Sequence, residues 1–252
     1  MSDPVAEAAA ILIVARSGPE HRIADLPAAL KPTDQAAAYA IQHKVAATYA
    51  AIGGWKVGAA GPEAEPMCGA LPATGFAASP ARLSSARHPL RGIEAEICFR
   101  MAHDLPPRPT PYGRDEVVAA IAAAHPAIEE LESSYRDPDA VDMLTNAADT
   151  QVHGGFIYGA PVVDWHKIDF ANEPVEQYVD GALQMQRVGN PAGDMIRLMV
   201  WMANVGAVWA GGLKAGQFVT CGSWTGKSLV GPHADVRVRF PSVGEVSLTF
   251  TD

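Results

Sequence analysis

Two short segments of the chain carry closely spaced glutamates among apolar residues. In GIEAEICF, Glu94 and Glu96 alternate with isoleucine and alanine, so a strand there places both carboxylates on one face. The segment AIEELESSY adds Glu129, Glu130 and Glu132. Like charges on one face repel, and they are tolerated where the face meets water or a cation lies between them. Carboxylates from two strands suit a hard cation such as Mg²⁺ or Mn²⁺, and a solvated strand face is the alternative interpretation.

The segments that must position these glutamates are short, apolar and punctuated by glycine and proline. Helical spacing occurs in the two Ala-rich segments before residue 52, in RDEVVAAIAAAHP, and in NPAGDMIRLMVWMANVGAVWAGG. Strand patterns include WKVGAAG, GIEAEICFRM, AIEELESSY and FVTCGSWTG, and DVRVRFPSVGEVSLTF indicates a hairpin that turns near residues 241–244. This order predicts an α+β fold with a largely antiparallel or mixed sheet.

The N-terminal part of the chain differs from the rest in composition and in the spacing of its apolar residues. Residues 1–52 form an expected helical segment whose Ala-rich faces predict close packing on a neighbouring layer or subunit. Asp34 can cap its second helix, which a pair of glycines ends. Residues 53–252 contain no repeats and no low-complexity linker, so we expect one catalytic unit there.

Composition limits the kinds of partner. The net charge is -9 and no run of basic residues occurs, which argues against a nucleic-acid partner. Three separated cysteines are typical of reduced thiols, and the first residues lack the positive region of a signal peptide. The apolar runs are too short to span a bilayer, so we expect a cytoplasmic protein with no membrane partner. An acidic protein repels anions, so an anionic substrate would need a bound cation or a lysine.

Five segments in the same order resemble the 2-keto-4-pentenoate hydratase and oxalocrotonate decarboxylase family. They are GWKVG, RGIEAEICFRMAHDLP, PAIEELESS, LKAGQFVTCGSWTG and the closing VRVRF. The family belongs to the fumarylacetoacetate hydrolase superfamily, so the resemblance implies a mixed β-sandwich roll preceded by the N-terminal helical segment. It also implies that Glu94, Glu96 and Glu129 bind Mg²⁺ or Mn²⁺.

The resemblance assigns four further residues to the site. It implies that Lys56 binds the substrate carboxylate or transfers protons, that Asp149 lies close by, and that Ser223 and Thr225 face the substrate. Taken alone, these residues are typical of a surface strand lysine, a turn or cap aspartate, and a Gly-Ser-x-Thr turn. The chain departs from the family after Asp149, because residues 150–152 are Thr-Gln-Val where the family has Asn-Ala-Ser.

The leading functional hypothesis is a lyase that hydrates a 2-hydroxypenta-2,4-dienoate-like substrate, a small 2-oxo acid from aromatic-compound breakdown. A metal that chelates the 2-oxygen and the carboxylate would stabilise the charge that develops on that oxygen. Lys56 is the first candidate for proton transfer, with Glu132 or Asp149 as general base.

Two other functions remain open. The same chelate would assist decarboxylation of a 2-oxo-hexenedioate, which needs a cation such as Arg82, Arg87 or Arg100 for the distal carboxylate. A catalytically silent member that binds metal or a partner is the third hypothesis, and the altered residues 150–152 motivate it. We expect a homo-oligomer, from the Ala-rich helices and from the family resemblance.

Overall fold

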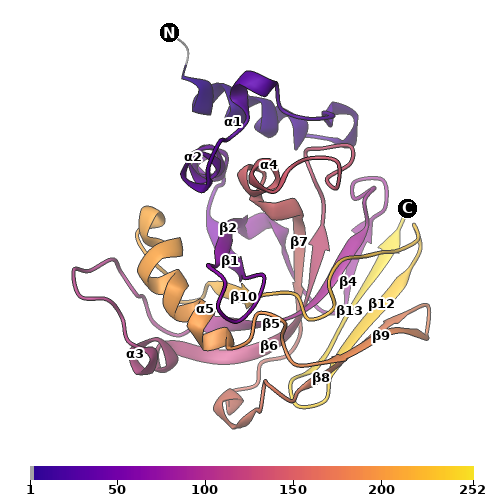
Figure 1. The fold of residues 1–252 in the computed structure, drawn as a ribbon. Coiled ribbons are helices and arrows are strands. Elements are labelled where there is room, and N and C mark those ends of the chain that lie inside the picture. Colours follow the sequence, from indigo (N-terminus) through magenta and orange to yellow (C-terminus); the bar gives the residue numbers. More distant parts are fainter. Residues whose placement is uncertain (1–2) are drawn as a thin grey trace.

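Two long strands, β5 (Gly92–Met101) and β6 (Ile121–Leu131), lie side by side in a mixed sheet (Figure 1). The other strands of this sheet are β1 (Ile52–Gly58), β2 (Met67–Pro72), β3 (Phe76–Ala78), β7 (His153–Tyr158), β10 (Phe218–Cys221) and β11 (Ser228–Leu229). In the computed structural model, which describes residues 3–252, they follow the order β2-β1-β10-β5-β6-β7-β3, with β11 on β5. Among the strand pairs described for this first sheet, only β1 with β10 and β3 with β7 run parallel.

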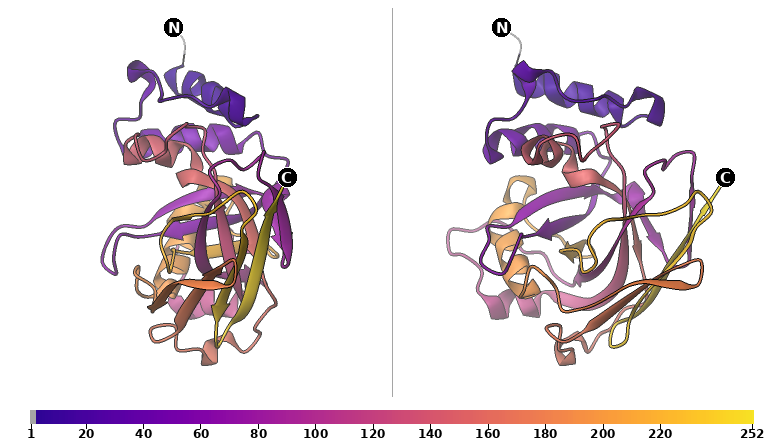
Figure 2. Two further views of the ribbon diagram at one scale, coloured as in Figure 1. Left: turned by 90° about the vertical axis from the view of Figure 1, so that its right-hand side faces the viewer. Right: turned by 45° about the vertical axis from the view of Figure 1, so that its right-hand side comes forward.

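A second sheet packs against the first. Its strands are β4 (Ala81–Ser84), β8 (Pro174–Val179), β9 (Ala182–Val188), β12 (Asp235–Phe240) and β13 (Gly244–Thr251). They follow the order β4-β13-β12-β8-β9, and β12 and β13 contact β6 of the first sheet (Figure 2). The predicted hairpin is confirmed, since Phe240 of β12 pairs with Gly244 of β13. The two sheets together form the mixed roll expected from the sequence.

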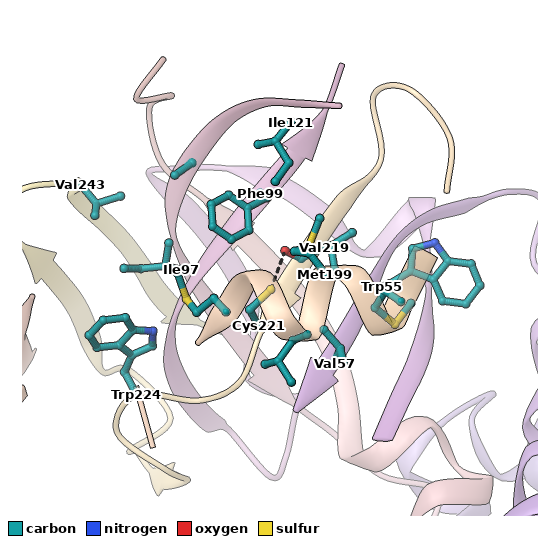
Figure 3. Packing of buried hydrophobic residues seen from close by; sticks show 14 of the residues in the cluster. Trp55, Val57, Ile97, Phe99, Ile121, Met199, Val219, Cys221, Trp224 and Val243 are labelled. Carbon is teal, nitrogen blue, oxygen red and sulfur yellow. Dashed lines mark hydrogen bonds between the residues drawn. The ribbon is translucent and has the colours of Figure 1, made fainter. Parts of the chain in front are cut away.

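The main apolar core lies behind the glutamates. Because side chains alternate along β5, Ile97 and Phe99 are fully buried on the face opposite Glu96. They share one cluster with Trp224, which follows β10, and with Met199 of helix α5 (Met195–Trp201) (Figure 3). Burial of each large apolar side chain stabilises the fold by about 1.5–3 kcal/mol, so the core fixes the position of the strand that carries the carboxylates.

Three helices gather at one end of the sheets (Figure 2). They are α1 (Pro4–Ala15), α2 (Gln35–Ala46) and α4 (Met143–Ala148). Asp34 caps α2 as predicted, accepting a hydrogen bond from Ala37 N at 2.8 Å, but the predicted end is wrong, since α2 ends at Ala46 and the Gly53-Gly54 pair lies in β1. The three helices share an apolar cluster of their own, which includes Leu12, Ile41 and Ala147. The N-terminal helices therefore pack on a later part of the chain, and the division into residues 1–52 and 53–252 stays a prediction.

Helices α3 (Arg114–Ala119) and α5 (Met195–Trp201) contact each other beside the first sheet. The chain beyond α5 continues as a π-helical turn (Met202–Gly206) and a 3₁₀ turn (Val208–Ala210). Other 3₁₀ turns are Pro19–His21, Ala28–Leu30, Ala73–Gly75, Thr150–Val152 and Trp165–Lys167. Within residues 3–252, no helix is both long enough and apolar enough to cross a membrane.

The helix predicted over RDEVVAAIAAAHP is wrong in its second half. Helix α3 ends at Ala119, and β6 begins at Ile121 and continues through the alanines. Alanine favours helices, but a strand between β5 and β7 buries nearly every side chain of this segment and pairs its backbone on both sides. Tertiary packing therefore overrides the local propensity. The late helix also differs, since it begins after Asp194 and not at the Asn-Pro pair.

A buried ion pair joins α1 to the end of α4. Arg16 donates to the Asp149 carboxylate at 2.7 Å and to the backbone oxygens of Asp149 and His153 at 2.5 and 3.0 Å. Ser134 donates to the same carboxylate from its backbone nitrogen at 2.8 Å and from its hydroxyl at 2.6 Å. Asp149 is thus a structural hub between the helical layer and the sheet.

We expect Arg16→Met to lower the free energy of unfolding by about 3 kcal/mol, because it leaves the buried Asp149 carboxylate without its counter-charge. Chemical denaturation of the metal-free protein measures this change. Lys167→Met is the matched control, since Lys167 belongs to an exposed pair with Asp164 and its loss should change stability little. Equal effects of the two substitutions would contradict the anchoring role of Arg16.

Candidate metal centre and active site

Strands β5 and β6 bring the three predicted metal ligands together. Glu94 lies directly across from Glu129 in the antiparallel register, and Glu96 follows on the same face of β5. One carboxylate oxygen from each of the three lies within 4.8 Å of the others. Glu96 and Glu129 are 2% and 0% exposed, so the solvated strand face that the sequence left open is excluded for these two.

The charges of this cluster are not balanced by protein groups alone. Burial, together with the charges of Glu129 and Glu94, raises the pKa of Glu96 well above its ordinary value. Burial also raises the pKa of Glu94, against the opposing effect of Lys56. One oxygen of Glu129, Oε2, is buried without a hydrogen-bond partner among residues 3–252. All-oxygen ligands with an unpartnered buried carboxylate oxygen fit a hard divalent cation such as Mg²⁺ or Mn²⁺.

Two basic side chains share the other oxygen of Glu129. Lys56 Nζ donates to Oε1 at 2.7 Å from β1, and His153 Nδ1 lies 2.9 Å from the same atom at the start of β7. Burial acts to raise the pKa of Glu129, but Lys56 and His153 together hold it below its ordinary value. Burial likewise acts to lower the pKa of Lys56, and the neighbouring carboxylates outweigh it, so Lys56 is an ammonium here.

His153 is a site residue that the sequence did not reveal. Its position in HGGF, just before a glycine-rich strand and after the altered residues 150–152, was the only signal. Thr220 of β10 was missed in the same way, and its hydroxyl donates to Oε2 of Glu96. Both residues orient carboxylate oxygens of the cluster from strands on either side of β5 and β6.

The loop after β10 reaches the cluster through Ser223. Burial raises the pKa of Glu94 and the Ser223 hydroxyl acts against it, while the same hydroxyl oxygen accepts from Gly226 N at 2.9 Å. Thr225 has a different set of contacts, because its Oγ1 accepts from the backbone nitrogen of Ala95 at 3.0 Å. Thr225 therefore ties the loop to β5. A contact of Ser223 or Thr225 with substrate stays a prediction.

The two candidates for general base have other partners. Glu132 directly follows β6 and lies at Gly154, as does Glu130, so it is on the opposite side from Glu129. Glu132 accepts from Leu90 N at 2.5 Å and forms an ion pair with Arg22. Asp149 is fully buried, with both oxygens occupied by Arg16 and Ser134. These contacts do not support a general-base role for Glu132 or Asp149, since neither joins the glutamate cluster.

A strained turn lies between Asp149 and His153. Thr150, Gln151 and Val152 have φ angles of 59°, 53° and 65°, in the left-handed region that side chains other than glycine avoid. Each such residue costs roughly 1–2 kcal/mol. The backbone oxygen of Gln151 accepts from Lys56 Nζ at 3.0 Å, so the turn is the second anchor of this ammonium. The segment that departs from the family pattern thus contacts the site through its backbone.

A cavity of about 640 Å³ lies next to this turn. Its lining includes Gly58, Met67, Asp139, Val141 and Gln151, so it is largely apolar and adjoins the strand that carries Lys56. A larger cavity of about 920 Å³ is lined by segments around Trp165 and Asn190, and none of the predicted site residues lines either cavity. We consider the smaller cavity the candidate substrate site, because Gln151 lines it and accepts a hydrogen bond from Lys56.

Cys68 does not resemble a catalytic thiol. It is buried, its backbone nitrogen donates to the Tyr39 hydroxyl at 3.1 Å, and burial raises its pKa to about 12. A thiol with this pKa is protonated at neutral pH and is a poor nucleophile.

Comparison with known proteins identifies relatives of this fold and sequence. No family model matches the chain. A 4-oxalocrotonate decarboxylase from Pseudomonas sp. is 30% identical over 167 residues, which are 63% of this chain, and the match spans only 60% of that relative's length. The 4-oxalocrotonate decarboxylase of Pseudomonas putida G7, complexed with magnesium and adipate, has a TM-score of 0.84 at 23% identity, covering 98% of this chain and 97% of that one.

The family resemblance is thereby confirmed. The same Pseudomonas putida enzyme complexed with calcium and acetate matches with a TM-score of 0.82 at 23% identity, again over 98% and 97% of the two chains. A Yersinia pestis CO92 protein assigned to the fumarylacetoacetate hydrolase family matches with a TM-score of 0.58 at 15% identity, over 78% of this chain and 91% of its own. The predicted α+β fold, a mixed roll of the fumarylacetoacetate hydrolase type, is confirmed as well.

We expect Mg²⁺ to bind the wild-type protein and to raise its melting temperature, because a ligand that binds only the folded state stabilises it. Glu96→Gln should weaken Mg²⁺ binding by about 10²-fold or more, since loss of even an outer partner of a metal costs roughly 10–100-fold. Isothermal calorimetry measures the affinity. Glu116→Gln, at an exposed pair with Arg108, is the control and should bind Mg²⁺ normally.

The same experiment has a predicted pH dependence. The pKa values of Glu94 and Glu96 are raised in the metal-free folded protein, so the folded state holds more protons than the unfolded state above the ordinary value of 4.5. Their contribution to metal-free stability therefore falls as the pH rises from 4.5 toward the raised values. Mg²⁺ competes with these protons, so its stabilising effect should grow over the same window. A Mg²⁺ effect that is constant with pH would contradict binding at this cluster.

Proposed function

We propose that this chain is a Mg²⁺-dependent decarboxylase of a 2-oxo-hexenedioate, and thus a lyase. The observation that carries the proposal is the cluster of Glu94, Glu96 and Glu129 beside the buried Lys56 ammonium. The decarboxylase names of the relatives in sequence and in structure support the reaction type. Magnesium in the complex of the structural relative supports the choice of cation.

The chemistry requires a site that accepts negative charge at the 2-oxygen of the substrate. Loss of the distal carboxylate as carbon dioxide leaves its electron pair in the conjugated chain, and a proton then completes 2-hydroxypenta-2,4-dienoate. Glu94, Glu96 and Glu129 would hold the cation, which supplies Lewis-acid stabilisation of the charge on that oxygen. The three carboxylates alone would repel a dianionic substrate, so this assignment also explains how such a substrate can bind.

Lys56 has the position that a proton donor or a carboxylate anchor needs. Its ammonium lies between Glu129 Oε1 and the Gln151 backbone oxygen, which use two of its three N–H groups. The third can meet the substrate carboxylate or deliver a proton. Because the side chain is only 12% exposed, water has limited access to this ammonium.

Hydration of a 2-hydroxypenta-2,4-dienoate, our leading hypothesis from the sequence, becomes the second candidate. The comparisons favour decarboxylation over it, since both the sequence relative and the best-matching structure described above carry the decarboxylase name. The catalytically silent alternative has weaker support, because Gln151 of the altered residues 150–152 accepts a hydrogen bond from Lys56. Assembly into a homo-oligomer stays a prediction.

The proposal is tested by incubating the protein with Mg²⁺ and 2-oxohex-3-enedioate while carbon dioxide release is recorded. We expect release that a chelator abolishes and that Glu129→Gln lowers by about 10²-fold or more. Consumption of 2-hydroxypenta-2,4-dienoate with uptake of water, and no carbon dioxide from the dicarboxylate, would establish the hydratase instead. Normal Mg²⁺ binding with neither reaction would favour the silent alternative.

A separate prediction concerns the role of Lys56. If it transfers a proton, Lys56→Ala should lower kcat by roughly 10²-fold or more. If it only holds the carboxylate, KM should rise with kcat largely kept. Lys56→Arg separates these roles because arginine keeps the charge and does not release a proton at neutral pH. Steady-state kinetics decide, and normal kcat and KM in Lys56→Ala would place this residue outside the site.

A further inference from the structure

A dicarboxylate substrate requires a cation for its second carboxylate, and the predicted arginines do not meet this need. Arg82 is exposed on β4 of the second sheet. Arg87 lines a small cavity on the Glu132 side of β6. Arg100 is exposed near the end of β5, with its guanidinium 5.6 Å from the centre of the Phe218 ring.

Lys227 lies in the loop that joins β10 to β11, next to the metal ligands. Thr225 ties this loop to the Ala95 backbone, and Ser228, just after the loop, pairs with Ile93 of β5. The positive charge of Lys227 acts with that of Lys56 to lower the pKa of Glu94, against the dominant effect of burial. Lys227 directly precedes Ser228, whose partner Ile93 is the residue before Glu94, so the strand pairing places this second cation near the cluster.

The ammonium of Lys227 pairs with a residue that lines the candidate substrate cavity. It donates to both carboxylate oxygens of Asp139, one of them at 2.6 Å. Asp139 and Gln151 belong to the lining of the same cavity, and Gln151 contacts Lys56. Each of the two lysines therefore contacts a residue that lines this cavity. The Asp139 side chain is 74% exposed and that of Lys227 is 29% exposed.

We propose that Lys227 is the specificity-determining residue that binds the distal carboxylate of the substrate. The inference rests on the proposed function and names the substrate class of that site as 2-oxo dicarboxylates. A ligand whose 2-oxo acid end lies at Glu94, Glu96 and Glu129 would extend into the cavity toward Asp139. Its second carboxylate replaces that of Asp139 on the ammonium, because an exposed ion pair is weak and exchanges readily. A ligand with a neutral tail leaves the Lys227 pair intact and gains nothing from it.

Two ligands of equal length test this assignment. 2-Oxoadipate and 2-oxohexanoate share the 2-oxo acid end and differ in the distal carboxylate. In calorimetry with saturating Mg²⁺, we expect the wild-type protein to prefer 2-oxoadipate by about tenfold or more, the usual scale for a charge-assisted contact. Lys227→Met should remove this preference by weakening 2-oxoadipate alone. Lys227→Arg should restore much of it, and Asp139→Asn should strengthen 2-oxoadipate binding because a competitor is lost.

Lys214→Met is the matched control, since Lys214 also pairs with an exposed aspartate, Asp104, and should leave both affinities unchanged. No preference in the wild-type protein would overturn the proposal. An equal loss for both ligands in Lys227→Met would also overturn it, because a folding defect acts on both. Binding is measured without turnover, so a retained preference together with no carbon dioxide release would refute the decarboxylase function and leave the role of Lys227 intact.

Discussion

Repulsion among three carboxylates that β5 and β6 hold side by side is the constraint on which the rest of the site depends. The antiparallel register places Glu94 across from Glu129, and the apolar core behind β5 prevents the strands from relaxing apart. Lys56 and His153 both contact one oxygen of Glu129, and Thr220 binds one oxygen of Glu96. Protein groups therefore neutralise only one edge of the cluster, and the oxygens that remain converge where a cation can satisfy them.

The alternation of side chains along β6 separates two polar networks that are adjacent in sequence. Glu129 faces the cluster, whereas Glu130 and Glu132 face Gly154 on the other side, where His88 and Arg22 meet them. A shift of one residue in the register would exchange these environments. The long pairing of β6 with both β5 and β7 prevents such a shift, so neighbouring glutamates have unrelated roles.

Local patterns in the sequence were sufficient for some features and insufficient for others. Period-two alternation placed Glu94 and Glu96 on one face, and the Asp34 cap located α2. The helix propensity of alanine misassigned the first half of β6, where packing between two strands decides. The partners of Asp149 and Glu132 come from Arg16 and Arg22, more than a hundred residues away along the chain. Local spacing contains no information about such contacts, so both carboxylates looked available for catalysis.

The left-handed turn at residues 150–152 links the helical layer to the chemistry. Its residue types, threonine, glutamine and valine, do not signal positive φ, so only the structure reveals it. Arg16 of the N-terminal segment holds Asp149 before the turn, and Glu129 holds His153 after it. Fixed at both ends, the strained backbone directs the Gln151 oxygen at Lys56. The helical layer contributes no ligand to the glutamate cluster, but through this turn it helps to orient the Lys56 ammonium.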